Sequence, residues 1–274
     1  MRLPSHPFRL AIIASLSTIC LIYALHAHDL WLIPPEQSKT GTIALIRAHS
    51  GMEFPNSEHA PNPARFKRKL VMAPDGSETA LEAAGTDDAE KSGLLRFTPR
   101  QPGIYVAAVE TEPRLITLSA EEFNHYLVSD GLLHIYELRH KEKSLDQSGK
   151  ERYSKSPKAL LQVGNGTSGD PCRMIGLPLE IVPLQNPFSL KVGATLRVKV
   201  LFQQKPLHDA HLGWDVPGDG VEHSGTVRTN ARGEALIPIA QTGLMTIRLT
   251  HMTRPKTAEY EWESFWTSLT FRIP

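Results

Sequence analysis

Leu179-Glu180-Ile181-Val182-Pro183 begins the part of the sequence that decides the fold. After it, short runs of β-branched and apolar residues recur at roughly 8–15-residue intervals, with turn residues and no helical periodicity between them. We expect about seven strands here, at residues 179–183, 195–202, 211–216, 225–229, 235–239, 243–250 and 264–273. This pattern is typical of an immunoglobulin- or transthyretin-like β-sandwich.

The preceding half of the chain also predicts mainly β structure. Alternating residues and flanking turn signals predict strands at residues 29–33, 42–48, 64–72, 94–98 and 103–110. A dense cluster of turn residues follows, Gly-Asn-Gly-Thr-Ser-Gly-Asp-Pro at 164–171, and we place a linker there. We therefore predict two β-sandwich domains, an N-terminal one at residues 28–165 and a C-terminal one at residues 176–274.

A short helical insertion is expected at about residues 119–143 of the N-terminal domain. Ser119 and Glu122 have the spacing of a capping box, in which each residue satisfies a backbone N–H of the other. The apolar residues of one helical face then follow as Phe123, Tyr126 and Leu127. The charged run at 141–155 is expected to be a loop.

The first 27 residues predict a secretion signal. Arg2 and Arg9 form a positive region before an apolar run at 10–25, and a short polar stretch with alanine follows. The run is shorter than the about 20 residues of a comfortable membrane span, and a retained anchor is the alternative. Cleavage after Ala27, or alternatively after Ala24, predicts a periplasmic or secreted protein without membrane insertion once the signal is removed.

Composition excludes several classes of partner. The 274-residue chain has 30 Lys and Arg against 29 Asp and Glu, and the predicted leader holds two arginines but no acidic residue. The remainder is close to neutral, so there is no electrostatic case for binding nucleic acid or an anionic membrane. Cys20 would leave with the leader and Cys172 would be alone, so no internal disulfide is expected. The sequence does not indicate the oligomeric state.

Several stretches together resemble one family. They are His28-Asp29-Leu30-Trp31, Gly176-Leu177-Pro178-Leu179-Glu180-Ile181-Val182-Pro183-Leu184, Asn186-Pro187, Thr229-Asn230-Ala231-Arg232-Gly233 and Trp262-Glu263-Ser264-Phe265-Trp266. The sequence resembles the DUF4198 family, which is grouped with the NikM-like periplasmic components of cobalt and nickel transport systems. The resemblance implies an exported β-rich protein associated with transition-metal uptake, with an envelope metal transporter as its partner.

Histidines are the main candidate ligands for a metal. After cleavage at Ala27, His28 would offer both its α-amine and its imidazole, and nitrogen-rich tetragonal sites favour Cu(II) or Ni(II). His251, at the end of the predicted strand 243–250, is the expected partner from across the sandwich. The alternative is that His28 is a solvated terminus and His251 a hydrogen-bonded strand end.

Weaker candidates complete the expected site. His49 and His59 flank a short turn and could approach the N-terminus, while His208 and His211 lie three residues apart near another turn. Glu263 could add a carboxylate near His251. The expected cofactor is a divalent transition metal, namely nickel, cobalt or copper.

The sequence has no Gly-x-Ser-x-Gly, no His-Glu-x-x-His and no P-loop, so these enzyme motifs give no support for a catalytic function. The preferred hypothesis is a non-enzymatic metal-binding accessory to metal uptake, and a copper oxidase of the histidine-brace type ranks last. The alternative is a cell-envelope module that binds a glycan or protein partner through its β-sandwich. Tyr260, Trp262 and Trp266 share one predicted strand face, as either sandwich core or an exposed platform.

Overall fold

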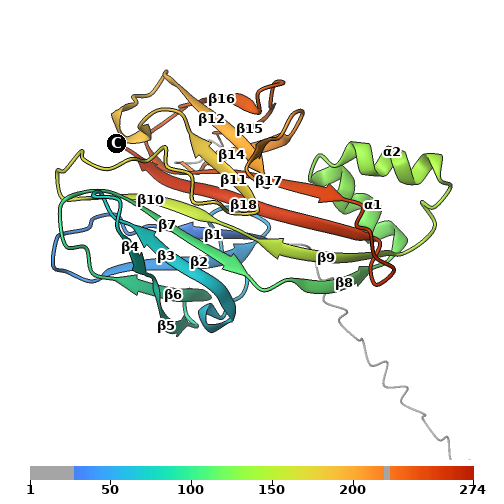
Figure 1. Cartoon of the computed structure of the whole chain (residues 1–274), viewed down its shortest axis with the longest axis horizontal. Helices are drawn as coiled ribbons and strands as arrows, with labels where there is room; N and C mark the ends of the chain where they lie inside the picture. Colours follow the sequence, from blue (N-terminus) through green and yellow to red (C-terminus); the bar gives the residue numbers. More distant parts are fainter. Residues whose placement is uncertain (1–27, 219–222) are drawn as a thin grey trace, which may run out of the picture.

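The computed structural model of the chain describes residues 28–218 and 223–274 (Figure 1). The predicted leader and its cleavage site lie outside these described residues. Strands make up 49% of the described residues and helices 10%, which confirms the prediction of a mainly β, sandwich-like fold. Within the described ranges, no helix combines the length and apolar character needed to cross a membrane.

A ten-stranded sheet forms the centre of the fold. In order across the sheet, it contains β15 (His223–Arg228), β14 (His211–Val216), β17 (Gly243–Thr253), β18 (Trp262–Ile273), β10 (Lys158–Val163), β7 (Gly103–Thr111), β3 (Phe66–Met72) and β4 (Glu78–Ala80). The pair β9 (Gly149–Lys155) and β8 (Arg114–Leu118) extends the sheet beside the first half of β18. Strands from both sides of the expected linker therefore share one sheet.

Two four-stranded sheets pack on this central sheet. One contains β1 (Asp29–Ile33), β2 (Ala44–Gly51), β6 (Ser92–Phe97) and β5 (Glu82–Asp87), and the other contains β11 (Leu179–Pro183), β12 (Thr195–Phe202), β13 (Lys205–Pro206) and β16 (Glu234–Pro238). Alternate residues of β7 join different cores. Tyr105 and Ala107 pack with β1 and β2, whereas Val106 and Ala108 pack with β11 and β12. The two small sheets thus cover opposite faces of β7.

A helical hairpin covers the end of the sheet where β8, β9 and the start of β18 lie (Figure 1). It consists of α1 (Ala120–Ser129) and α2 (Leu133–Lys141), which fits the insertion expected at 119–143. The predicted capping box is present, since Ser119 and Glu122 bond each other's backbone N–H groups. The apolar face of α1 packs on Trp262 and Trp266 and closes a third core.

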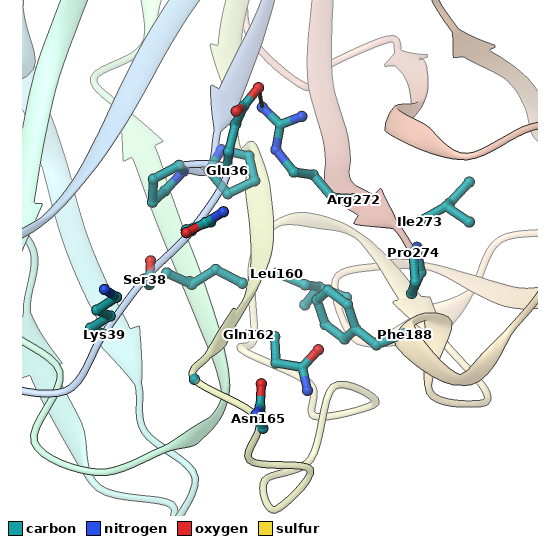
Figure 2. A pocket seen from close by; sticks show the side chains of 15 residues that line it. Glu36, Ser38, Lys39, Leu160, Gln162, Asn165, Phe188, Arg272, Ile273 and Pro274 are labelled. Atoms are coloured by element: carbon teal, nitrogen blue, oxygen red, sulfur yellow. Dashed lines mark ion pairs between the residues drawn. The ribbon is translucent and has the colours of Figure 1, made fainter.

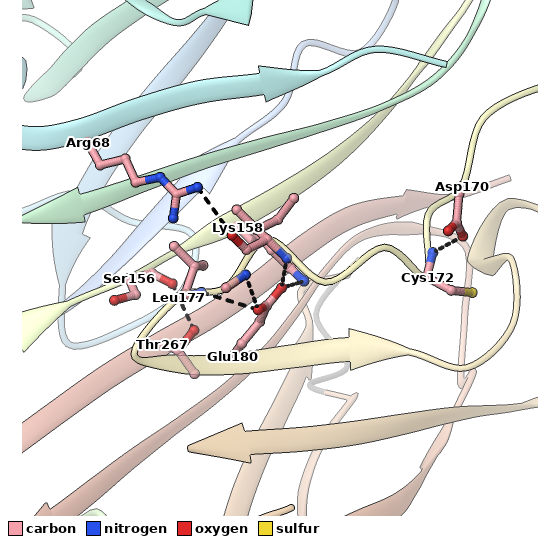
Figure 3. Close-up of polar contacts among 10 residues, drawn as sticks. Arg68, Ser156, Lys158, Asp170, Cys172, Leu177, Glu180 and Thr267 are labelled. Atoms are coloured by element: carbon pink, nitrogen blue, oxygen red, sulfur yellow. Dashed lines mark hydrogen bonds and ion pairs between the residues drawn. The ribbon is translucent and has the colours of Figure 1, made fainter. Parts of the chain in front are cut away.

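The segment between β10 and β11, residues 164–178, has no regular secondary structure and lies where the linker was expected. Short 3-10 helices, η1 (Pro63–Arg65) and η2 (Pro187–Ser189), occur elsewhere. A buried ion pair joins the two flanking strands, with Lys158 Nζ 2.8 Å from Glu180 Oε1 (Figure 3). The prediction of a loop over 141–155 was wrong from Gly149 onward, because that part forms β9.

Candidate functional site

The turn after β2 folds back over the start of β1. β1 and β2 are antiparallel, with Asp29 opposite Gly51, so residues just beyond Gly51 emerge beside His28. The buried ring of Phe54 packs edge-on against Trp31, with ring centroids 5.4 Å apart. A bridge between Ser50 and His59 then closes the turn. This local fold places Glu58 and His59 beside the first described residue of the chain.

His28, Glu58 and His59 form a histidine–carboxylate cluster at this point. His28 Nε2 lies 3.0 Å from Glu58 Oε2, and the centroids of the two imidazole rings are 4.8 Å apart. The backbone N–H of Met52 and the neighbouring His28 lower the pKa of the Glu58 carboxyl. Burial and the charge of His28 lower the pKa of His59. The cluster therefore offers a carboxylate and a preferentially neutral imidazole, which are the forms that bind a metal.

Charged residues beneath the cluster fix the backbone of His28. The Lys155 ammonium donates a hydrogen bond to the His28 carbonyl and lies over the ring of Trp266, 5.3 Å from its centroid. Burial lowers the pKa of Lys155 to about 8. Asp29 forms an ion pair with Arg248 of β17 at 3.1 Å. The start of β1 is thus anchored on β9 and β17.

His251 is not brought to this cluster. On β17, Arg248 contacts Asp29 and Thr250 donates to Asp130 Oδ2 at 2.8 Å, so this face points toward β1 and α1. His251 has the opposite parity and packs edge-on against Phe202 of β12, with ring centroids 4.5 Å apart. Burial lowers the pKa of His251 to about 4, so this imidazole is neutral at physiological pH. The side chains of His28 and His251 lie on opposite sides of the central sheet.

The weaker candidates take separate positions. His49 Nδ1 bonds the carbonyl of Pro55 at 2.8 Å, which leaves its Nε2 buried and without a hydrogen-bond partner among the described residues. His208 is exposed in a turn, and His211 begins β14. The Glu263 carboxylate forms an ion pair with Arg152. Within residues 28–218 and 223–274, no three His, Cys, Asp or Glu side chains are arranged as a ready-made metal site.

Trp262 and Trp266 belong to the core. Trp262 and Trp266 are 1% and 3% exposed and pack against α1, with Trp266 stacked on Tyr126 at 5.5 Å between ring centroids. A ligand platform made by these two tryptophans is therefore excluded by their burial. These two tryptophans are core residues, but their core lies beneath the helical hairpin, and Tyr260, expected on the same face, precedes β18 and is half-buried.

A pocket of about 470 Å³ lies at the far end of β1, between the segment after Ile33 and the end of β18 (Figure 2). Arg272 reaches toward Glu36 across its upper rim, with Arg272 Nη2 3.8 Å from Glu36 Oε1. Leu160 and Phe188 contribute apolar surface to its lining. The length of β1 separates this pocket from His28, so it adds nothing to the histidine–carboxylate cluster.

The fold and the cluster together define a mainly β, sandwich-like protein with histidines and a carboxylate at the start of its first strand. A family model described as a domain of unknown function, DUF4198, matches residues 25–253, so the chain belongs to that family. A search of the curated proteins finds no match.

Two solved structures show distant likeness. One is a crystal structure of a tetra-tandem repeat in the extending region of a large adhesion protein, at 13% identity and a TM-score of 0.25. That match covers 90% of this chain and 49% of the other, so the chain spans about half the length of that structure. The other is a two-domain fibronectin type III segment of chicken tenascin, at 13% identity and a TM-score of 0.19, covering 87% and 98%. Neither likeness bears on function.

Proposed function

We propose that this is an exported, non-enzymatic protein that binds a divalent transition metal and serves as an accessory to metal uptake at the cell envelope. The observation that carries the proposal is the contact of His28 with both Glu58 and His59. The resemblance to NikM-like proteins supports nickel or cobalt as the metal, and nitrogen-rich ligation supports nickel or copper. An envelope metal transporter is the proposed partner.

The proposed ligands differ from the expected pair, because His59 replaces His251. Imidazole nitrogen and carboxylate oxygen are established ligands of divalent transition metals. Signal cleavage after Ala27 would add the α-amine of His28, whose ordinary pKa near 7.7–8.0 allows a metal to displace its proton at neutral pH. The amine would then complete a set that the described side chains do not form alone.

Removing either histidine is expected to weaken metal binding by about 10–100-fold or more, the scale of losing a ligand or its support. The test titrates the secreted protein with Ni(II), Co(II) and Cu(II) by calorimetry, comparing wild type with His28→Ala and His59→Ala. His125→Ala, an exposed histidine of α1, is the matched control and should bind as wild type does. An unchanged affinity in both cluster variants would overturn the proposal.

The role of the amine has its own test. A chain with one extra alanine before His28 retains every cluster side chain but converts the amine into an amide. We expect it to lose metal affinity, and mass spectrometry of the secreted wild-type protein should give His28 as the first residue. Loss of binding in His251→Ala, with His59→Ala unaffected, would instead favour the pair expected from the sequence.

A further inference from the structure

A second pocket, of about 440 Å³, opens directly beside the histidine–carboxylate cluster, and His59 belongs to both the cluster and the pocket lining. We propose that this pocket binds a small organic anion that carries two or three carboxylate groups. The proposal concerns a ligand separate from the metal. It stands on the charge, the hydrogen-bonding capacity and the apolar surface of the pocket lining.

Cations from three different elements converge on the pocket. Arg65 is the last residue of η1, Arg114 is the first residue of β8, and Lys155 is the last residue of β9. Glu112 is the single acidic residue in the lining, so the basic side chains outnumber it by three to one. A pocket with this balance attracts anions and repels cations.

The two guanidinium groups are available to a ligand. Neither Arg65 nor Arg114 forms an ion pair or a side-chain hydrogen bond with any described residue. By contrast, Arg47, Arg152 and Arg254 are each paired with a carboxylate of the chain. A guanidinium binds a planar carboxylate through two parallel hydrogen bonds, so two arginines suit a ligand with at least two carboxylates.

The remaining lining favours an organic skeleton over an inorganic ion. Leu30 and Phe66 contribute apolar surface, and Asn62 and Tyr153 add groups able to hydrogen-bond a hydroxyl or a further carboxylate. The volume falls within the roughly 300–1,000 Å³ range of small-molecule sites. Inorganic phosphate would leave the apolar surface and much of this volume unused.

Carboxylates held beside His59 would also be placed to supply oxygen ligands to a metal bound by His28 and His59. This one step rests on the proposed function. Anion binding by the metal-free protein does not depend on it, so the two proposals fail independently.

The test measures binding of propane-1,2,3-tricarboxylate to the metal-free secreted protein by calorimetry at low ionic strength. We expect saturable binding that weakens as salt is added. Arg65→Gln and Arg114→Gln should each weaken it by about tenfold, as for loss of a charge-assisted hydrogen bond. Arg100→Gln, an exposed arginine outside the pocket, is the matched control and should leave the affinity unchanged.

The proposal is overturned if the tricarboxylate does not bind, if the double variant Arg65→Gln/Arg114→Gln binds it as wild type does, or if the neutral triamide binds with the same affinity. Tighter binding of inorganic phosphate than of the tricarboxylate would also overturn it, because the pocket would then recognise a phosphate and not an organic polycarboxylate. A circular dichroism spectrum identical to that of wild type shows that the arginine variants are folded.

Discussion

Replacing Lys158 by methionine is expected to lower the free energy of unfolding by about 3–5 kcal/mol, the usual cost of leaving a buried charge without its partner. The side chains of Lys158 and Glu180 are 1% and 2% exposed. Methionine keeps most of the apolar volume of lysine, so the loss reports the missing charge more than a cavity. Urea unfolding of the two proteins at neutral pH measures the difference.

The environment of Glu180 explains why the effect is large. Its carboxylate accepts a hydrogen bond from the Lys158 ammonium at 2.8 Å (Figure 3). It also accepts hydrogen bonds from the backbone N–H groups of Ile175, Gly176 and Leu177 at 2.8, 2.9 and 3.3 Å. Burial lowers the pKa of Lys158, and the negative charge of Glu180 opposes that shift. Without the lysine, three backbone donors alone must stabilise a buried anion.

The controls separate this pair from a general effect of losing a lysine. Lys150→Met removes an exposed lysine of β9 and should change stability by no more than about 0.5 kcal/mol. Lys158→Met/Glu180→Gln should cost less than the sum of the two single changes, because the second change removes the unpaired charge. If the losses of unfolding free energy in the two single variants simply add in the double variant, Lys158 and Glu180 do not stabilise each other. The same conclusion follows if Lys158→Met costs as little as Lys150→Met.

The fold class followed from patterns that depend only on local sequence. The β-branched and apolar residues over 103–110 predicted a strand, and β7 forms there with both of its faces buried. The spacing of Ser119 and Glu122 predicted the helix start that the structure contains. In both cases the side chains that decide the structure are near neighbours in the sequence, so periodicity was sufficient.

The sequence did not predict strand β9, and the reason is physical. β9 reads Gly-Lys-Glu-Arg-Tyr-Ser-Lys, and such a run indicates a solvated loop when considered alone. Yet Glu151 is 1% exposed, because Tyr126 and Ser264, distant in sequence, hydrogen-bond its carboxylate. Lys158 of β10 is buried for the same kind of reason. Only tertiary contacts make these charged residues compatible with the interior.

The candidate site was predicted in part. His28 was identified from its place after the predicted leader, and His59 as a residue that could approach it. The antiparallel register of β1 and β2 is the stronger indication of a cluster here, because it places the turn after Gly51 beside His28. The choice of His251 required knowing which face of β17 points toward β1, and strand parity alone does not fix that.

The second large expected effect concerns pH. Glu151→Gln should gain stability relative to wild type by about 2–3 kcal/mol when the pH is raised from 5 to 8. Burial raises the pKa of the Glu151 carboxyl from 4.5 to about 7. Its Oε1 accepts hydrogen bonds from Tyr126 and Ser264, while Oε2 is buried without a partner among the described residues. An ionised carboxylate is therefore poorly stabilised at this position.

The direction follows from where the proton is bound. Below pH 4.5 the carboxyl is protonated in both the folded and the unfolded chain, so the pH has no effect through this group. Between pH 4.5 and about 7 the folded protein keeps the proton that the unfolded chain has lost. The wild-type protein therefore loses folding stability through Glu151 as the pH rises through that window. Glutamine does not titrate, so Glu151→Gln does not undergo this loss.

Urea unfolding of wild type and Glu151→Gln at pH 5 and pH 8 tests this expectation. Burial also raises the pKa of Asp130 to about 7, but Asp130 is present in both proteins, so its contribution largely cancels in the comparison. Glu121→Gln, an exposed residue in the first turn of α1, is the control and should follow the pH dependence of wild type. The same pH dependence in Glu151→Gln and wild type would mean that Glu151 is ionised in the folded protein as readily as in the unfolded chain.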